Sequence, residues 1–310
     1  MSRMWQKHPE RGSVFTMKLI TWLSLTLGRP LGRLLLYPIC AYFVIFARAG
    51  RRASRAYLSR VLDRPATLAD VYRHHYYFAS TLLDRAFLLA GRDEKFEVRS
   101  HGLEVMYRVI ESGRGAILLG AHLGSFDLTR TLGEKRRGLV VNMMMFEENA
   151  RKVNKVIDSL GGKQRMRVIP IGSVDALIQA KERLDQGQMI GILGDRVMFD
   201  DKVVRAKFLG KDAAFPAGPF LVAAALRVPV IIFSCLYRGG NRYDEYFELL
   251  ADEVVLDRKT RAADLQVWVE RYAARLEHYC RLAPYNWFNF FDFWGSQPPA
   301  ELPPAVQDPA

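Results

Sequence analysis

The chain has 310 residues, half of them apolar, and a formal net charge of +12. This length predicts one large domain with a small appendage, and the composition supplies a sizeable core. The three cysteines lie far apart in the sequence, which excludes a disulfide framework and a cysteine-rich zinc site and indicates a reducing compartment.

The positive charge is concentrated at the start of the chain. Residues 1–65 hold 12 Lys or Arg against two acidic residues, so this fifth of the chain carries +10 of the +12. Two apolar runs, 14–28 and 34–47, flank the sequence RPLGR, and Pro38 interrupts the second run of 14 uncharged residues. A spanning helix needs about 18 or more apolar residues. We therefore expect two short helical pieces that enter one leaflet of a membrane, with the cations on anionic headgroups. The alternative is a helical hairpin packed on the domain.

A basic chain also suggests nucleic acid as a partner. Here the basic residues stand beside leucines and phenylalanines rather than along a polar helix. The sequence also has no zinc-finger spacing, no basic region with heptads and no RNA-binding aromatic signature. We expect no nucleic-acid partner.

The pattern of the middle and the end of the chain predicts an α/β domain. An amphipathic helix is expected over 67–91, with His74 and His75 at its core edge or surface, and another helix over 103–112. Adjacent histidines on a helix face different directions, so they share no metal. Strands alternate with helices beyond this point, which predicts a mostly parallel sheet flanked by helices. The expected strands are 115–121, 138–146, 167–172, 189–195, 228–238 and one or two within 243–256. One helix is expected to follow residue 125, and the others are expected over 149–160, 174–187, 218–227 and 261–282.

The sequence ILLGAHLGSFDLTR (117–130) places a lone imidazole at the end of an apolar strand. Gly124 permits a tight turn, Ser125 is a good helix N-cap, and Asp127 falls in the first helical turn. On one helix, His122 and Asp127 would point about 140° apart. Across a strand–turn–helix junction they can meet, and a carboxylate bonded to one ring nitrogen leaves the other nitrogen as a base. Equally, Asp127 stabilises the helix start and His122 is a core histidine.

Asp195 ends another expected strand, MIGILGD, and functional groups in such sheets gather at the carboxyl ends of strands. This favours the catalytic interpretation of His122. The chain lacks the G-x-S-x-G, G-x-G-x-x-G, G-x-x-x-x-G-K-[ST] and H-E-x-x-H motifs. A base without an evident nucleophile predicts that the substrate supplies a hydroxyl or an amine.

The sequence HLGSFD (122–127) resembles the H-x-x-x-x-[DE] box of the lysophospholipid acyltransferase superfamily. More specifically, GILGDR (191–196), KFLGKDAAFPAGPFLVAAAL (207–226) and LEHYCRLAPYNWFNFFDFW (276–294) resemble, in order, later blocks of the bacterial lipid A late acyltransferases. The resemblance covers most of residues 10–295. It implies a glycerolipid acyltransferase-like fold over 66–295 and a membrane-anchoring segment over 1–65. The proline-rich composition of 296–310 predicts a disordered tail.

The resemblance also implies an activity. In that family a fatty acyl group moves from acyl carrier protein, or sometimes coenzyme A, to a lipid-linked hydroxyl at the cytoplasmic face of the inner membrane. His122 would be the general base and Asp127 its partner, without a metal or redox cofactor. Asp195 falls on an acidic active-site residue, and Arg196 would hold a phosphate or phosphopantetheine anion. Their alternative role is an ion pair at the strand end. Gly124 and Gly210 would contact substrate, the latter in an acceptor loop whose residues equally suit plain turns.

The sequence departs from the family at PYNWFNFFDFW (284–294), which is aromatic where late lipid A acyltransferases are basic. This leaves the acceptor open between lipid A and another lipid, as in a branch associated with aryl-polyene or fatty-acid-like pathways. Aromatic residues there also suit core or interfacial packing. Four alternatives remain for the function: an N-acyltransferase, a thioester hydrolase, a non-catalytic lipid-binding or carrier protein and, last, a nucleic-acid-binding protein.

Overall fold

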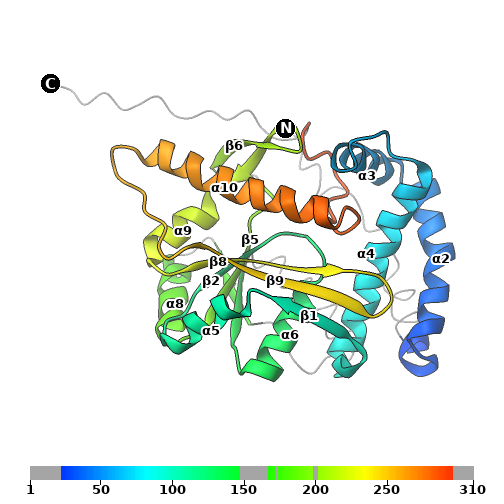
Figure 1. Ribbon diagram of the computed structural model, residues 1–310, viewed down its shortest axis with the longest axis horizontal. Coiled ribbons are helices and arrows are strands. Elements are labelled where there is room, and N and C mark those ends of the chain that lie inside the picture. Colours follow the sequence, from blue (N-terminus) through cyan, green and yellow to red (C-terminus); the bar gives the residue numbers. More distant parts are fainter. Residues whose placement is uncertain (1–21, 147–166, 172–173, 198–201, 296–310) are drawn as a thin grey trace.

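The computed structural model describes residues 22–146, 167–171, 174–197 and 202–295. They form an α/β fold around a seven-stranded sheet, as predicted (Figure 1). Five neighbouring pairs of strands run parallel, and β8 and β9 run antiparallel. In spatial order the strands are β1 (Glu97–His101), β9 (Arg242–Ala251), β8 (Val230–Tyr237), β2 (Ile117–Gly120), β5 (Met189–Leu193), β3 (Val141–Met145) and β4 (Val168–Pro170).

Helices cover both faces of the sheet. The central strand β2 requires this cover, since all of its residues are apolar or small and all are buried. Side chains alternate between the two faces of a strand. Leu119 packs in one cluster with residues of α10, which crosses that face, and Leu118 packs in another with residues of α5 (Figure 1). The helices are α2 (Arg29–Phe46), α3 (Arg48–Val61), α4 (Leu68–Leu89), α5 (Leu103–Glu111), α6 (Phe126–Arg137), α8 (Val174–Asp185), α9 (Gly218–Leu226) and α10 (Arg261–Leu282), with a 3₁₀ turn at Asp93–Lys95.

The structure differs from the expected elements in two places. The sequence around Gly210 was expected to be a loop, but it belongs to an antiparallel hairpin of β6 (Val203–Phe208) and β7 (Lys211–Pro216). Strand β1 (Glu97–His101) was not expected, whereas the single strand β9 (Arg242–Ala251) falls on one of the two expected alternatives for 243–256 and pairs with β8. The helix expected over 149–160 and the tail over 296–310 lie outside the described residues.

The N-terminal apolar segment is more continuous than we expected. The sequence RPLGR forms the first turns of α2 instead of a break, since Pro30 lies in the first turn, where it removes no helical hydrogen bond. The break falls at Gly28, which has a φ of +95°. Helix α2 is 18 residues long and is apolar enough to cross a membrane, by length and composition alone.

Helix α2 lies along α4 rather than apart from the domain (Figure 1). It buries a stripe spaced by four residues, namely Gly32, Leu36, Cys40 and Val44. At its start, Arg29 donates two hydrogen bonds of 2.7 Å to the buried carboxylate of Asp84 on α4. Tyr243 on β9 donates a third, of 2.6 Å, to the same carboxylate. The described part of the N-terminal segment is therefore attached to the domain by polar as well as apolar contacts.

Candidate active site

His122 and Asp195 lie at the same edge of the sheet. His122 follows β2 and Asp195 follows β5, and these neighbouring parallel strands pair Gly120 with Leu193. Their carboxyl ends therefore coincide, as strand ends do in a parallel sheet. The loop 283–290, which follows α10, packs against both: Phe288 N–H donates to the main-chain oxygen of His122 at 2.7 Å.

The carboxylate bonded to the imidazole is that of Asp195. Its Oδ1 accepts a hydrogen bond from His122 Nδ1 at 2.8 Å, and its Oδ2 accepts the main-chain N–H of His122 at 3.0 Å. Asp195 is fully buried, whereas the side chain of His122 is 29 % exposed. The pair thus joins an enclosed anion to an imidazole that solvent or substrate can reach.

The surroundings fix the protonation of this pair. Burial acts to raise the pKa of Asp195, but the charge of His122 and the hydrogen bonds from it hold that pKa well below its usual range. Burial and the Arg196 guanidinium lower the pKa of His122, against the opposing effect of Asp195. Near neutral pH the imidazole is therefore uncharged. Because an ionised carboxylate only accepts, the ring proton lies on Nδ1 and Nε2 keeps its lone pair. This is the protonation state of a general base.

Arg196 is held by the loop that follows α10. Its Nε donates to Asn289 Oδ1 at 2.7 Å, and its Nη2 donates to the main-chain oxygen of Phe288 at 3.1 Å. Burial lowers the pKa of Arg196, and Asp195 acts to raise it. Among the ion pairs of the described residues, Arg196 and Asp195 do not form the direct pair that we considered, since the amide of Asn289 lies between them. Anion binding by Arg196 stays a prediction.

Asp127 occupies the predicted first turn of α6, and Ser125 caps this helix by accepting from Leu128 N–H at 3.4 Å. The carboxylate of Asp127 faces a different partner from the predicted one: its Oδ2 lies 3.0 Å from Arg85 Nε on α4. Within the described part of the chain, its Oδ1 has no hydrogen-bond partner. The catalytic pairing of Asp127 with His122 therefore stays a prediction that no contact here supports.

The two glycines proposed to contact substrate have different surroundings. Gly124 has a φ of +70°, and a Cβ there would lie 1.9 Å from the main-chain oxygen of Cys235. The backbone conformation and this clash are enough to require glycine in the turn after His122, without any contact to substrate. The N–H of Gly124 donates to the main-chain oxygen of Asn286 at 2.9 Å. Gly210 lies in the turn of the β6–β7 hairpin, where a Cβ would meet no atom within 4 Å. Substrate contact by either glycine stays a prediction.

Two further residues of the site, Trp287 and Asn289, were not predicted from the sequence. Trp287 Nε1 and Asn289 Nδ2 donate to Asp195 Oδ2 at 2.9 and 3.0 Å. Both belong to the aromatic stretch that we interpreted as core or interfacial packing. The signal was present, because two asparagines interrupt an otherwise apolar run, and buried amides need partners.

His74 is fully buried, and not at the core edge or surface as expected. Its Nε2 bonds to the main-chain oxygen of Trp287 at 2.9 Å, and its Nδ1 bonds to Ser54 Oγ at 2.7 Å. The described residues contain no group of three or more side chains that could hold a metal ion.

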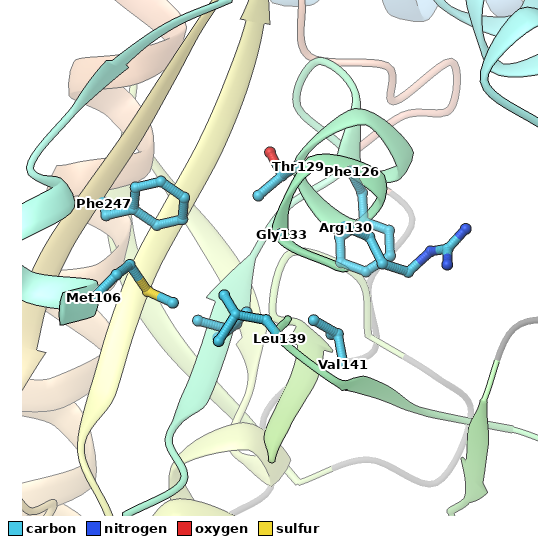
Figure 2. Close-up of a pocket in the computed structure, with 9 residues that line it drawn as sticks. Met106, Phe126, Thr129, Arg130, Gly133, Leu139, Val141 and Phe247 are labelled. Carbon is cyan, nitrogen blue, oxygen red and sulfur yellow. The ribbon is translucent and has the colours of Figure 1, made fainter. Parts of the chain in front are cut away.

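A small apolar cavity lies beneath α6, on the face of the sheet that α5 also covers (Figure 2). Its volume is about 10 Å³, which suits roughly one water molecule and no acyl chain. His122 is not part of its wall. The lining residues are Met106, Leu118, Phe126, Thr129, Arg130, Gly133, Leu139, Val141 and Phe247.

Comparison with known proteins identifies the family of the chain. Residues 5–295 match the model of a family described as bacterial lipid A biosynthesis acyltransferase. No match was found among the curated proteins. The matched range includes the strand ends, the loop that follows α10 and all the described N-terminal helices. The chain therefore belongs to the bacterial lipid A biosynthesis acyltransferase family and is an acyltransferase, with acyl transfer to a lipid acceptor as the family's activity.

Proposed function

We propose that this chain transfers a fatty acyl group from the thioester of acyl carrier protein or coenzyme A to a hydroxyl of a membrane lipid, with His122 as general base. The observation that carries the proposal is the 2.8 Å bond between His122 Nδ1 and the buried Asp195 carboxylate. It directs the ring proton to Nδ1 and leaves Nε2 as the proton acceptor. The acceptor is lipid A or another lipid with a free hydroxyl.

In this mechanism, Nε2 removes the proton of the acceptor hydroxyl while the oxygen attacks the thioester carbonyl. The C–S bond of the resulting tetrahedral intermediate breaks, and the departing sulfur takes the proton back from the imidazolium. Asp195 stabilises the imidazolium between the two proton transfers. The new ester and the free thiol account for every atom, so the reaction needs no oxidant or reductant.

The negative oxygen of the tetrahedral intermediate needs hydrogen-bond donors or a cation. The N–H groups of Gly124 and Ser125, which follow His122, already donate to main-chain oxygens of Asn286 and Cys235. We therefore assign the cationic role to Arg196, whose charge acts on His122. Contact with a phosphate of the thioester donor is the alternative role of this guanidinium, because the pantetheine arm separates that phosphate from the reacting carbonyl and Arg196 can take only one of the two roles.

The proposed location is the cytoplasmic face of the inner membrane. Leu34, Ile45 and Phe46 on α2 are 56–60 % exposed, although each is a large apolar residue. Arg48 and Arg52 on the adjoining α3 are also exposed, where they can meet anionic headgroups. Since α2 lies along α4 and Arg29 is bonded to Asp84, we favour a helix that lies in the membrane interface over one that crosses it.

The experiment is acyl transfer from labelled acyl carrier protein or acyl coenzyme A to lipid extracts, with product lipids identified by mass spectrometry. His122→Ala should lower turnover by at least roughly a hundredfold, because the base is lost. The matched control is His278→Ala, at an exposed histidine of α10, which should retain the wild-type rate. Near-normal transfer by His122→Ala would exclude the mechanism. Acyl release at the same rate with and without lipid would make the chain a thioester hydrolase.

A further inference from the structure

The two oxygens of Asp195 have unequal surroundings. Oδ1 accepts from His122 Nδ1, while Oδ2 accepts three N–H donors, from the main chain of His122, the indole of Trp287 and the amide of Asn289. Three donors on one oxygen prevent the carboxylate from turning about its own axis. The direction of Oδ1 towards the imidazole is therefore set by the groups on Oδ2.

Trp287 is held in place from both of its ends. Its indole is fully buried and packs against Tyr57, with ring centroids 4.9 Å apart, and against Phe208 at 5.2 Å. Its main-chain oxygen bonds to His74 Nε2. A carbonyl only accepts, so His74 carries its proton on Nε2 and accepts from the Ser54 hydroxyl at Nδ1. The indole N–H therefore has little freedom to leave Asp195.

The amide of Asn289 has only one chemically reasonable orientation. Arg196 offers donors only, so Asn289 must turn its oxygen to Arg196 Nε, at 2.7 Å. Its nitrogen then faces the Asp195 carboxylate, at 3.0 Å, where it donates. The amide thus separates the guanidinium from the carboxylate. Without this separation Arg196 could pair directly with Asp195 and compete with His122 for the carboxylate.

We propose that Trp287 and Asn289 are positioning residues for the reaction, which hold the Asp195 carboxylate so that Oδ1 is reserved for His122 Nδ1–H. The proposal rests on the proposed role of His122 as the base. Neither residue need touch the substrate. Each acts through Asp195, by spreading part of the carboxylate's charge over donors other than the imidazole. Loss of the Trp287 donor should concentrate that charge on His122 and stabilise its imidazolium form, whereas loss of the Asn289 amide should let Arg196 compete for the carboxylate.

The test is Trp287→Phe, which keeps a large aromatic ring and removes the N–H donor. The charged groups that act on the His122 proton are Asp195 and Arg196, and this variant leaves both in place. We expect kcat to fall between about tenfold and a hundredfold with KM nearly unchanged. The acidic limb of the pH profile should move upward by roughly half a unit to one unit, with the pKa of His122.

The titration of His122 gives a measurement that does not depend on activity. Imidazole resonances of the full chain in detergent micelles can be followed by NMR, and His122→Gln assigns the signal among the six histidines. Asn289→Leu removes the amide between Asp195 and Arg196 without adding a charge, so Arg196 can pair with Asp195 and the pKa of His122 should fall. This variant tests the proposal even if Trp287→Phe does not fold.

The matched control is Trp294→Phe. This indole belongs to the same chain segment, but it donates to the main-chain oxygen of Phe208 at 3.3 Å and not to Asp195. We expect its His122 titration to remain that of the wild type. Two folded variants with an unshifted His122 pKa, or an equal shift in Trp294→Phe, would overturn the positioning role. If the wild type transfers no acyl group, the proposed function fails. The NMR titration of His122 would still show whether Trp287 and Asn289 act on His122 through Asp195.

Discussion

The strand-end site and the N-terminal helices are built in opposite ways. At the site, the Asp195 carboxylate is completely enclosed and accepts four hydrogen bonds. On α2, large apolar side chains such as Leu34 and Phe46 remain exposed. The first arrangement fixes one proton in one place, which acid–base chemistry requires. The second leaves apolar surface free for something outside the chain, and large exposed apolar patches mark such contacts.

The two regions nevertheless share one core. Tyr57 and Leu58 on α3 are buried in the same apolar cluster as Trp287, and Tyr57 packs on its indole ring. His74 on α4 bonds to the main chain of the same tryptophan. The helices that bear the exposed surface therefore also support the loop that holds Asp195. The comparison predicts that substitutions in the site act on turnover and that substitutions on the exposed face of α2 act on membrane binding.

The largest effect should come from the carboxylate of the site. Asp195→Asn replaces the anion that stabilises the imidazolium and permits the wrong ring tautomer, so turnover should fall by roughly a hundredfold or more. Asp127→Asn should lower turnover less, because its contact is with Arg85 at 3.0 Å. The measurement is kcat for both variants, with circular dichroism to check folding. A larger loss for Asp127→Asn would assign the partner role to Asp127 instead.

The sequence could predict His122 and Asp195 as strand-end residues but could not predict their pairing. Each residue follows an apolar run that ends in a small or polar segment, which is a local pattern. The strand order of the sheet places β5 next to β2, with β3 and β4 beyond it. A single sequence does not contain this order. Asp127 is the carboxylate nearest to His122 in the sequence, but the sheet brings Asp195 into contact with His122.

Membrane binding through the exposed face of α2, which is the proposed contact, should be sensitive to charge placed on that face. Leu34→Glu together with Phe46→Glu replaces side chains that are 60 % and 56 % exposed. Burial of such a side chain contributes about 1.5–3 kcal/mol, so binding should weaken by at least about tenfold. The measurement is flotation with vesicles that contain phosphatidylglycerol. The matched control is Ile178→Glu on α8, at 55 % exposure, which should bind as the wild type.

A deletion would give a less informative test of the same surface. Removal of residues 1–55 takes Arg29 away from the buried Asp84 and uncovers the face of α4 on which α2 packs. Such a chain would lose stability whether or not it binds membranes. If the double substitution leaves vesicle binding unchanged and the protein folded, the exposed face of α2 is not the contact surface.

Part of this N-terminal arrangement was predictable and part was not. Composition alone indicated apolar helices with cationic flanks; α2 contains most of the second expected apolar run, and the basic residues of α3 follow it. The side of α2 that faces the domain could not be predicted, because its buried stripe includes Gly32 and Cys40 while Leu34 and Phe46 remain exposed. Hydrophobicity ranks these residues in the opposite order. The choice is made by the close approach of α4, which small side chains on α2 permit.

The smallest effect should be a dependence of stability on pH through His74, which links the two regions. Burial, helped by the neighbouring His75, lowers the pKa of His74 to about 3, against the hydrogen bond to Trp287. Between pH 6.5 and 3 the unfolded chain therefore binds a proton at this site that the folded chain does not. Stability must fall as the pH falls through that window, by at most about 1.4 kcal/mol per pH unit for this histidine.

Urea unfolding at pH 7.5, 6.0 and 5.0 measures this effect, in a range where carboxylates remain ionised. His74→Gln keeps a side-chain N–H that can donate to the main-chain oxygen of Trp287 but has no group that titrates. The variant should be less stable than the wild type at pH 7.5 because its packing differs from that of a ring. Its free energy of unfolding should, however, decline less steeply between pH 6.0 and 5.0. Equal slopes for the two proteins would mean that His74 takes up its proton in the folded protein as easily as in the unfolded chain. The contacts of His74 would then contribute less to holding α4 against the loop 283–290 than the structure indicates.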